Sequence, residues 1–182
     1  MRIMSSLLLC VGAALVGPLV GQAVADVPGV SAVKFDPSTK LPTADRVVVR
    51  KGARRMDLLS GDRVLRSYRI ALGLSPTGHK ERSGDFRTPE GTYRLARRNA
   101  RSEFFLSIQV SYPNEADLAN ARRNGWQAGG SIMIHGLPNT LKHDPNYYRT
   151  RDWTDGCIAV SNSEMVEIWM LTNSNTPIDI LP

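Results

Sequence analysis

Two stretches of the chain decide its fold and direct the search for its function: Ser131-Ile-Met-Ile-His-Gly136 and Thr154-Asp-Gly-Cys-Ile-Ala-Val160. Each combines a short apolar run, which predicts a buried strand, with polar residues and a glycine at one end of the run. His135 closes the first run and Cys157 opens the second. Because functional residues gather where loops meet a rigid scaffold, we expect these two side chains to lie in one site.

The pairing of a cysteine with a histidine predicts nucleophilic chemistry. The thiolate is the reacting form of cysteine, and a thiol with a pKa near ~8.5 needs a basic partner to lose its proton at neutral pH. Histidine is well suited to take and return that proton. Gly156 permits a tight turn in which its own N–H and that of Cys157 can point at a developing oxyanion. We predict Cys157 as nucleophile and His135 as general base and acid, provided that the two strands lie side by side.

The alternative is a buried structural thiol beside an ordinary strand-end histidine, since free cysteine is among the most buried residue types. The amino-terminal sequence argues against it. Arg2 precedes an apolar run that ends in Ala23-Val24-Ala25, the pattern of a cleaved secretory signal peptide over residues 1–25. Cleavage would remove Cys10 and leave Cys157 unpaired in an oxidising compartment, where an odd thiol is an intermolecular bridge or a reactive group.

Two other interpretations of the amino-terminal run remain. The run is long enough to span a bilayer, so an uncleaved membrane anchor is the alternative to a signal peptide. A lipoprotein signal at Cys10 is disfavoured, because this cysteine precedes the body of the apolar run. We expect residues 26–45, which are rich in Pro, Ser and Thr, to form a leader or linker, and residues 46–182 to form the functional domain.

The composition is that of an ordinary globular protein. Of 182 residues, 42% are hydrophobic and 22% are charged, which excludes a disordered chain, a collagen-like repeat and a disulfide-dense mini-protein. The length supports one domain with a single core. The formal net charge of +6 favours an anionic neighbourhood such as a cell-envelope polymer, a lipid surface or nucleic acid.

The local patterns predict a mainly β fold with a few helices. Leu106, Ile108 and Val110 alternate with polar residues, as in a half-buried strand, and Ser60-Gly-Asp62 predicts a hairpin turn. A capping-box pattern opens a helix over 161–172, and a polar helix is expected over 114–124. Long loops are expected at 73–90 and 137–155. The predicted strands are 46–51, 56–59, 64–72, 91–95, 105–111, 131–134, 157–160 and 177–181.

Taken together, these motifs resemble the L,D-transpeptidase catalytic domain (YkuD-type) family. Its hallmark is a His-Gly pair followed further along by Ser/Thr-x-Gly-Cys, which here is His135-Gly136 and Thr154-Asp-Gly-Cys157. The stretch Gly84-Asp-Phe-Arg-Thr-Pro-Glu-Gly-Thr-Tyr93 is similar to the family's Gly-Asp-x-x-Thr-Pro-x-Gly-x-Tyr segment. The closing Thr176-Pro-Ile-Asp-Ile180 resembles its terminal strand. The resemblance covers roughly residues 45–182 and implies a β-sandwich catalytic domain.

The resemblance implies an enzyme of the periplasm or cell envelope that acts on peptidoglycan stem peptides. Cys157 would attack the carbonyl of the third stem residue, usually a diaminopimelate, and release the terminal D-alanine to leave a thioester. An amine from a second stem or from an envelope lipoprotein would resolve the thioester. With water as the acceptor, the protein would be an L,D-carboxypeptidase or amidohydrolase. A third interpretation is a catalytically silent envelope-binding module, which should show no thiol of low pKa.

The sequence departs from the commonest family pattern at two positions. Asp155 stands where a second histidine is usual, and Ala159 stands where an arginine is usual. Asp155 could accept a hydrogen bond that orients the site, or it could only shape the turn into Gly156. Arg149 or Arg151 could supply the missing positive charge, although a solvated loop charge is the simpler interpretation of each.

Other candidate sites are weaker. His79 and His143 lack the close spacing of a zinc site with Cys157 and His135, so we expect no metal and no other cofactor. Tyr147, Tyr148 and Trp153 could stack on a ligand, but packing is slightly favoured. The arginine pairs are scattered without aromatic platforms, so we expect no nucleic-acid partner; these pairs are Arg54-Arg55, Arg97-Arg98 and Arg122-Arg123.

Overall fold

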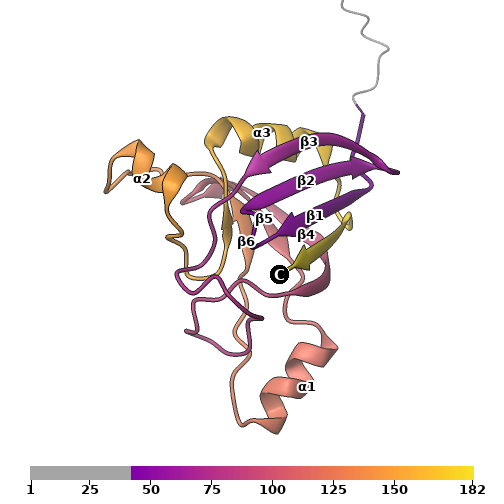
Figure 1. The fold of residues 1–182 in the computed structure, drawn as a ribbon, viewed down its shortest axis with the longest axis vertical. Helices are drawn as coiled ribbons and strands as arrows, with labels where there is room; N and C mark the ends of the chain where they lie inside the picture. Colours follow the sequence, from indigo (N-terminus) through magenta and orange to yellow (C-terminus); the bar gives the residue numbers. More distant parts are fainter. Residues whose placement is uncertain (1–41) are drawn as a thin grey trace, which may run out of the picture. The chain divides into compact units, whose positions relative to one another are not determined.

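The computed structural model describes residues 42–182, which contain eight strands and three helices (Figure 1). The predicted signal peptide and most of the predicted leader lie outside the described residues. None of the helices within 42–182 is long and apolar enough to cross a membrane. The strands are β1 Arg46–Arg50, β2 Arg55–Ser60, β3 Arg63–Arg69, β4 Gly91–Ser102, β5 Phe105–Val110, β6 Met133–His135, β7 Ile158–Ala159 and β8 Pro177–Leu181. The helices are α1 Glu115–Arg123, α2 Pro145–Thr150 and α3 Asn162–Leu171.

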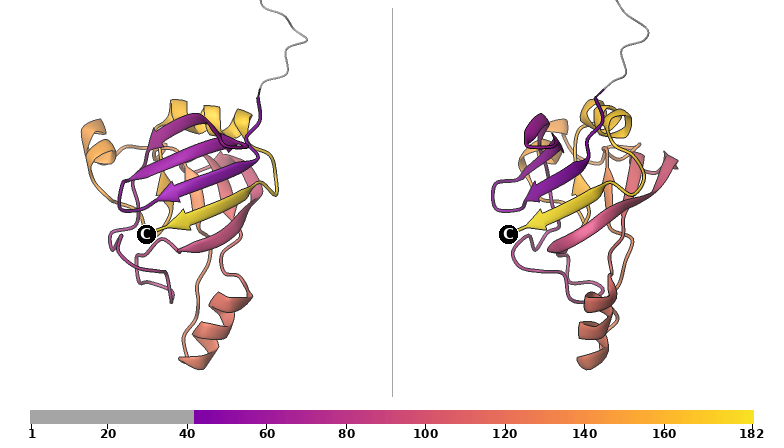
Figure 2. Two further views of the ribbon diagram at one scale, coloured as in Figure 1. Left: turned by 45° about the vertical axis from the view of Figure 1, so that its right-hand side comes forward. Right: turned by 90° about the vertical axis from the view of Figure 1, so that its right-hand side faces the viewer.

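The strands form one continuous hydrogen-bonded order, β3-β2-β1-β8-β4-β5-β6-β7. Strand β4 carries register shifts between Leu95 and Arg98 and between Asn99 and Ser102, where the sheet can bend. The half with β1, β2 and β3 faces the half with β5 and β6 across the molecule (Figure 2). Ala71, just after β3, exchanges backbone hydrogen bonds of 2.9 Å with Ala159 of β7, so the two ends of the order meet. The mainly β expectation is confirmed.

The hydrophobic core lies between the two halves and beneath α3. Alternate residues of the strands point into it, as the period of two requires. Helix α3 closes one side with Met165 and Ile168, both fully buried. The strand residues of the core include Val47, Val49, Met56, Leu58, Tyr93, Leu95, Ile108, Val110, Ile134, Ile158, Ile178 and Ile180.

The helix caps follow the sequence. The Ser161 side chain accepts from the Glu164 N–H while Glu164 bonds back to the Ser161 backbone, which is the predicted capping box of α3. Asn114 caps α1, and Asp117 completes a second capping box there. Helix α1 stands away from the strands (Figure 1). Its Asp117 carboxylate is tied to the domain by Tyr93 Oη at 3.0 Å and by His79 Nε2 at 3.1 Å.

The structure differs from the sequence-based expectations in several elements. The predicted loop 137–155 contains α2, whose signal was available: Asp144 caps the helix at Asn146 N–H, and Pro145 occupies the first turn. Strand β4 runs to Ser102 rather than Leu95, because β5 supplies a hairpin partner for its charged second half. Strand β3 ends at Arg69 rather than Leu72. The strands that carry the candidate site are shorter than expected, at 133–135 and 158–159.

Candidate active site

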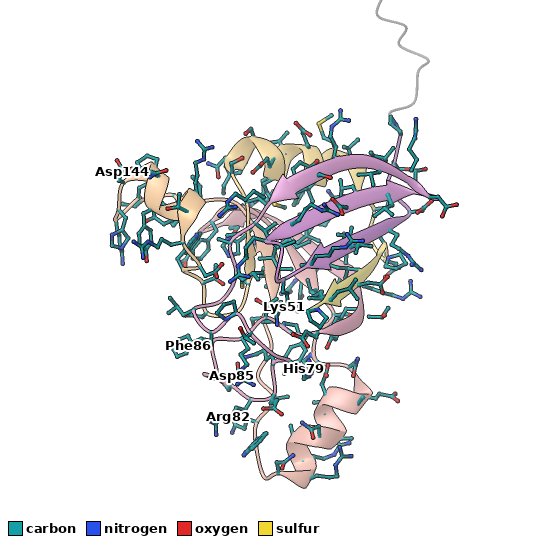
Figure 3. All side chains as sticks on the ribbon, viewed as in Figure 1. Lys51, His79, Arg82, Asp85, Phe86 and Asp144 are labelled. Carbon is teal, nitrogen blue, oxygen red and sulfur yellow. The ribbon has the colours of Figure 1, made fainter. Side chains whose placement is uncertain are left out.

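A cavity of about 810 Å³ opens where β6 and β7 meet the long loop 73–90 and the β4–β5 hairpin. His135 and Cys157 both line it. The loop contributes Lys80 and Phe86, and the hairpin contributes Arg101. Figure 3 shows the loop residues His79, Arg82, Asp85 and Phe86 gathered between the strands and α1. Segments far apart in the sequence thus form one concave site, which is the usual form of a ligand pocket.

The two decisive strands lie side by side. Strands β6 and β7 pair in parallel, with Ile134 opposite Ile158 and His135 opposite Ala159. Cys157 therefore enters the sheet beside Met133, and Met133 and His135 share a face because side chains alternate along a strand. The condition on which the Cys157–His135 pair depended is met, although the catalytic roles of the two residues stay predictions.

Burial keeps His135 neutral. The residue is only 3% exposed; Phe104 packs on it at a tilt and Trp153 packs on it edge-on, with ring centroids 4.6 and 5.6 Å away. Burial lowers the pKa of His135 to about 4, while its hydrogen bond to Gly136 acts in the opposite direction. Nδ1 lies 2.7 Å from the Gly136 carbonyl oxygen, which can only accept a hydrogen bond. Nδ1 therefore carries the proton, and Nε2 presents a free lone pair to take one.

Burial also keeps the Cys157 thiol protonated. It raises the pKa of this thiol, and the nearby charge of Asp155 raises it further, whereas the Met133 backbone and the Lys80 charge lower it. The thiol Sγ donates to the Ser131 carbonyl at 3.6 Å. The free protein thus holds a neutral thiol and a neutral imidazole. A raised thiol pKa is compatible with both an enzyme and a silent module, so the expectation that a low-pKa thiol separates the two stays a prediction.

The turn that precedes Cys157 is fixed by close backbone packing. Gly156 has a φ of +125°, and a Cβ added there would lie 2.6 Å from the Arg87 carbonyl oxygen, so only glycine fits. Thr154 is buried, and its Oγ1 donates to the Cys157 carbonyl at 2.8 Å and accepts from the Gly156 N–H at 3.2 Å. The Gly156 N–H, predicted as an oxyanion donor, is thus bonded within the turn. The Cys157 N–H remains the predicted donor.

Asp155 does not orient the imidazole. Its side chain is exposed at the wall of the cavity, and in residues 42–182 it accepts no hydrogen bond from His135. The Gly136 carbonyl takes the orienting position instead. Any residue can supply a backbone carbonyl, so the sequence does not reveal which one accepts the hydrogen bond from His135. From the sequence, only a side chain could therefore be considered for this role.

The long loop is held by a single carboxylate that sequence reasoning did not single out. Asp85 accepts from Lys80 Nζ at 2.7 Å and from three backbone N–H groups, those of Glu81, Arg82 and Arg87, at 2.8–3.1 Å. Burial alone would raise the pKa of Asp85, but these hydrogen bonds lower it to about 2. Since the Arg87 backbone packs on Gly156, Asp85 indirectly supports the turn that precedes Cys157. Its signal was Gly84-Asp85 in the segment that carries the resemblance.

The other predicted candidates occupy separate places. Trp153 packs on His135 and also lines the cavity of Cys157, so its packing role is confirmed, whereas stacking on a ligand stays a prediction. Tyr148 is buried, and its Oη accepts from the Lys142 N–H at 3.1 Å. Tyr147 stacks on His143, with ring centroids 4.3 Å apart.

Arg149 and Arg151, proposed as substitutes for the missing arginine, are exposed and line a different cavity, so they do not supply its charge. The cations that line the cavity of Cys157 and His135 are Lys80 and Arg101. His79 bonds to Asp117 and accepts from the Glu90 N–H, away from Cys157. Within the described part of the chain, no three His, Cys, Asp or Glu side chains are grouped as a metal site would require.

Comparison with known proteins identifies the family to which this domain is similar. Residues 44–180 match the model of the L,D-transpeptidase catalytic domain, YkuD. The chain is 36% identical over 108 residues to YafK of Escherichia coli (strain K12), a protein assigned to the L,D-transpeptidases; the match covers 58% of this chain and 36% of YafK. The chain therefore spans about a third of that relative.

Solved structures agree with the fold. The helical cell shape determining protein Pgp2 from Campylobacter jejuni matches with a TM-score of 0.57 and 25% identity, over 74% of this chain and 46% of Pgp2. An L,D-transpeptidase from Mycobacterium smegmatis matches with a TM-score of 0.50 and 13% identity, over 75% of this chain and 58% of that protein. At such identity the second match supports the fold alone.

We predict that Gly156→Ala damages the site more than a matched glycine substitution. Gly84 also has a positive φ, +76°, but has open space where a Cβ would lie. Gly84→Ala should therefore cost only backbone strain, about 1–2 kcal/mol in the free energy of unfolding. Gly156→Ala should cost more and slow the alkylation of Cys157, because its Cβ would displace the turn. Thermal unfolding and alkylation rates check this; equal losses in both variants would contradict the packing constraint.

We also predict the pH dependence of Cys157 alkylation in the free protein. A raised thiol pKa means that thiolate forms only above the ordinary range, and a His135 pKa of about 4 means that imidazolium forms only in acid. No pH then favours a thiolate–imidazolium pair. The iodoacetamide rate, measured in a Cys10→Ser background, should rise about tenfold per pH unit between pH 6 and 9. A rate plateau beginning near pH 5 would contradict these environments.

Proposed function

The chain belongs to the L,D-transpeptidase catalytic domain (YkuD) family, and on this premise we propose that it is an exported cysteine enzyme acting on peptidoglycan stem peptides. The observation that carries the proposal is the parallel pairing of β6 with β7, which brings His135 and Cys157 to one cavity. The cavity volume of about 810 Å³ lies within the range of ordinary small-ligand sites.

The first half-reaction uses the neutral pair directly. As Cys157 Sγ attacks the carbonyl carbon of the third stem residue, its proton passes to Nε2 of His135. The carbonyl oxygen becomes an oxyanion, which the Cys157 N–H stabilises. The C–N bond then breaks, and His135 returns the proton to the departing amine of the terminal D-residue. The products are a thioester on Cys157 and the free amine, and the imidazole is neutral again without an external acid or base.

The second half-reaction transfers the acyl group to an acceptor. In the proposed transpeptidase, the acceptor is an amine from a second stem or from an envelope lipoprotein. Asp155 and Glu103 are exposed and line the cavity, where their carboxylates would attract an amine in its protonated form. The bound amine must first lose one proton to solvent. As its nitrogen attacks the thioester carbonyl, His135 would take the second proton and return it to the departing Cys157 sulfur, so that the C–S bond breaks, an amide forms and the neutral thiol and imidazole are regenerated. Water in place of the amine would make the protein an L,D-carboxypeptidase, which the experiment below distinguishes.

The proposed location is the periplasm or cell envelope. It rests on the signal-peptide pattern of residues 1–25 and on the net charge of +6, which suits an anionic polymer. The similarity to Pgp2, which is described as a determinant of helical cell shape, is consistent with an enzyme that acts on the cell wall. We propose peptidoglycan stem peptides as the principal partner and an envelope lipoprotein as a second acceptor.

We predict that the purified chain removes or exchanges the terminal D-alanine of a tetrapeptide stem. Mass spectrometry of the products, with and without an added D-amino acid, reports the acceptor. Cys157→Ser should abolish turnover, and His135→Ala should slow it by about 10²- to 10⁴-fold, the usual contribution of a general acid–base. His143→Ala is the matched control, because that exposed imidazole stacks on Tyr147 of α2.

Each other outcome has a definite meaning. A hydrolysed tripeptide as sole product, with every amine offered, would make water the acceptor. Near-normal turnover by Cys157→Ser would overturn the cysteine mechanism. No turnover by the unmodified chain, with a folded protein, would leave the silent binding module as the better account.

A further inference from the structure

The cavity wall contains a nearly buried cation that the mechanism above does not use. Lys80 is 3% exposed and lines the same cavity as Cys157. An ammonium has three N–H donors. In the described residues two of them are accounted for, by Asp85 Oδ1 at 2.7 Å and by the Arg82 carbonyl at 3.0 Å. One donor therefore has no protein partner among the described residues, on a side chain that lines the cavity.

A second buried lysine shows what a purely structural ammonium looks like here. Lys51 is 2% exposed and donates to the Gly78 carbonyl, to the Thr88 carbonyl at 2.8 Å and to Glu90 Oε1 at 2.9 Å. All three of its donors are satisfied by the protein. Burying a charged group is costly unless its hydrogen bonds are made, so the unfilled donor of Lys80 calls for a partner.

Asp85 does not fully cancel the charge of Lys80. The Asp85 carboxylate also accepts three backbone N–H bonds, as described above, so its charge is shared among four donors. The charge of Lys80 is still felt at the reacting atom, since it lowers the pKa of Cys157 against the effect of burial. The ammonium is therefore placed to act on a group bound next to the thiol.

The chemistry of the substrate identifies that group. In the proposed reaction, the residue that leaves is joined directly to the carbonyl that Cys157 attacks. Its terminal carboxylate lies only a few bonds from that carbonyl and must occupy the same cavity. Ala159 provides no charge at the position where the family commonly has arginine, and Arg101, the other cation of the cavity, is exposed to solvent. A charge-assisted bond is strongest where water is excluded.

We propose that Lys80 binds the free terminal carboxylate of the leaving D-residue. The inference rests on the proposed function and deepens it, because it makes the enzyme specific for peptides with a free carboxyl end. Internal peptide bonds and amidated ends would lack the group that the ammonium recognises. Asp85 would be the positioning residue, because it holds the Lys80 side chain and the loop that carries it.

The test varies the substrate as well as the protein. Two tetrapeptide stems are compared, one ending in D-alanine and one in D-alanine amide, and kcat/KM is measured for each. The unmodified chain should prefer the acid by about 10- to 100-fold, the range expected for one hydrogen bond between charged groups. Lys80→Met should lower the rate with the acid to that with the amide. Lys80→Arg should restore part of the preference, and Arg101→Met, the matched control, should retain it.

The outcomes separate the inference from the proposed function. Equal turnover of acid and amide by the unmodified chain would overturn the inference and leave the function standing. Loss of the preference in Arg101→Met alone would move the carboxylate to Arg101, and an equal fall for both substrates in Lys80→Met would assign Lys80 a role without carboxylate recognition. If Lys80→Met does not fold, the acid–amide comparison and Lys80→Arg still decide. No turnover of either substrate would contradict the proposed function itself.

Discussion

The contact between the Gly156 backbone and the Arg87 carbonyl is the constraint on which the candidate site depends. This contact leaves no room for a Cβ on residue 156. The backbone conformations of the turn before Cys157 and of the loop 73–90 therefore depend on each other. Asp85 fixes the loop from within, and Thr154 fixes the turn through its hydroxyl. Cys157 is therefore held by backbone packing between two segments distant in sequence, and the parallel pairing of β7 with β6 brings it to the cavity that His135 also lines.

Burial determines the protonation states of His135 and Cys157 in the free protein. The same exclusion of water that lowers the pKa of His135 raises the pKa of Cys157, so neither group is charged in the free protein. In the neutral imidazole, Nδ1 donates its proton to the Gly136 carbonyl. Nε2 is therefore the nitrogen that can accept a proton. On the proposed mechanism, charge would appear only when substrate is attacked. An uncharged resting thiol would also be a weaker target for oxidants and other electrophiles.

The sequence predicted the framework well where the signal was local. The caps at Asn114 and Ser161 and the hairpin at Gly61 depend on neighbouring residues, and the structure has them. Cys157 and His135 were singled out as candidates because each stands at the end of an apolar strand, and the structure places both in one cavity while their roles stay predictions. The orienting carbonyl of Gly136 and the hydrogen bonds of Asp85 were not found, because they depend on backbone groups brought together by the fold. Lys80 was missed for a related reason: a lysine in a polar loop looks solvated until the fold buries it.

The central claim is that Cys157 becomes acylated by a stem peptide, and trapping that intermediate tests it most directly. The chain would be mixed with a tetrapeptide stem in stoichiometric amount, quenched in acid within the first turnover, and digested for mass spectrometry. The account predicts that the peptide containing Cys157 gains the mass of the stem without its terminal D-alanine, as a thioester that hydroxylamine removes. Release of D-alanine with no adduct on Cys157, or an adduct on another residue, would contradict it.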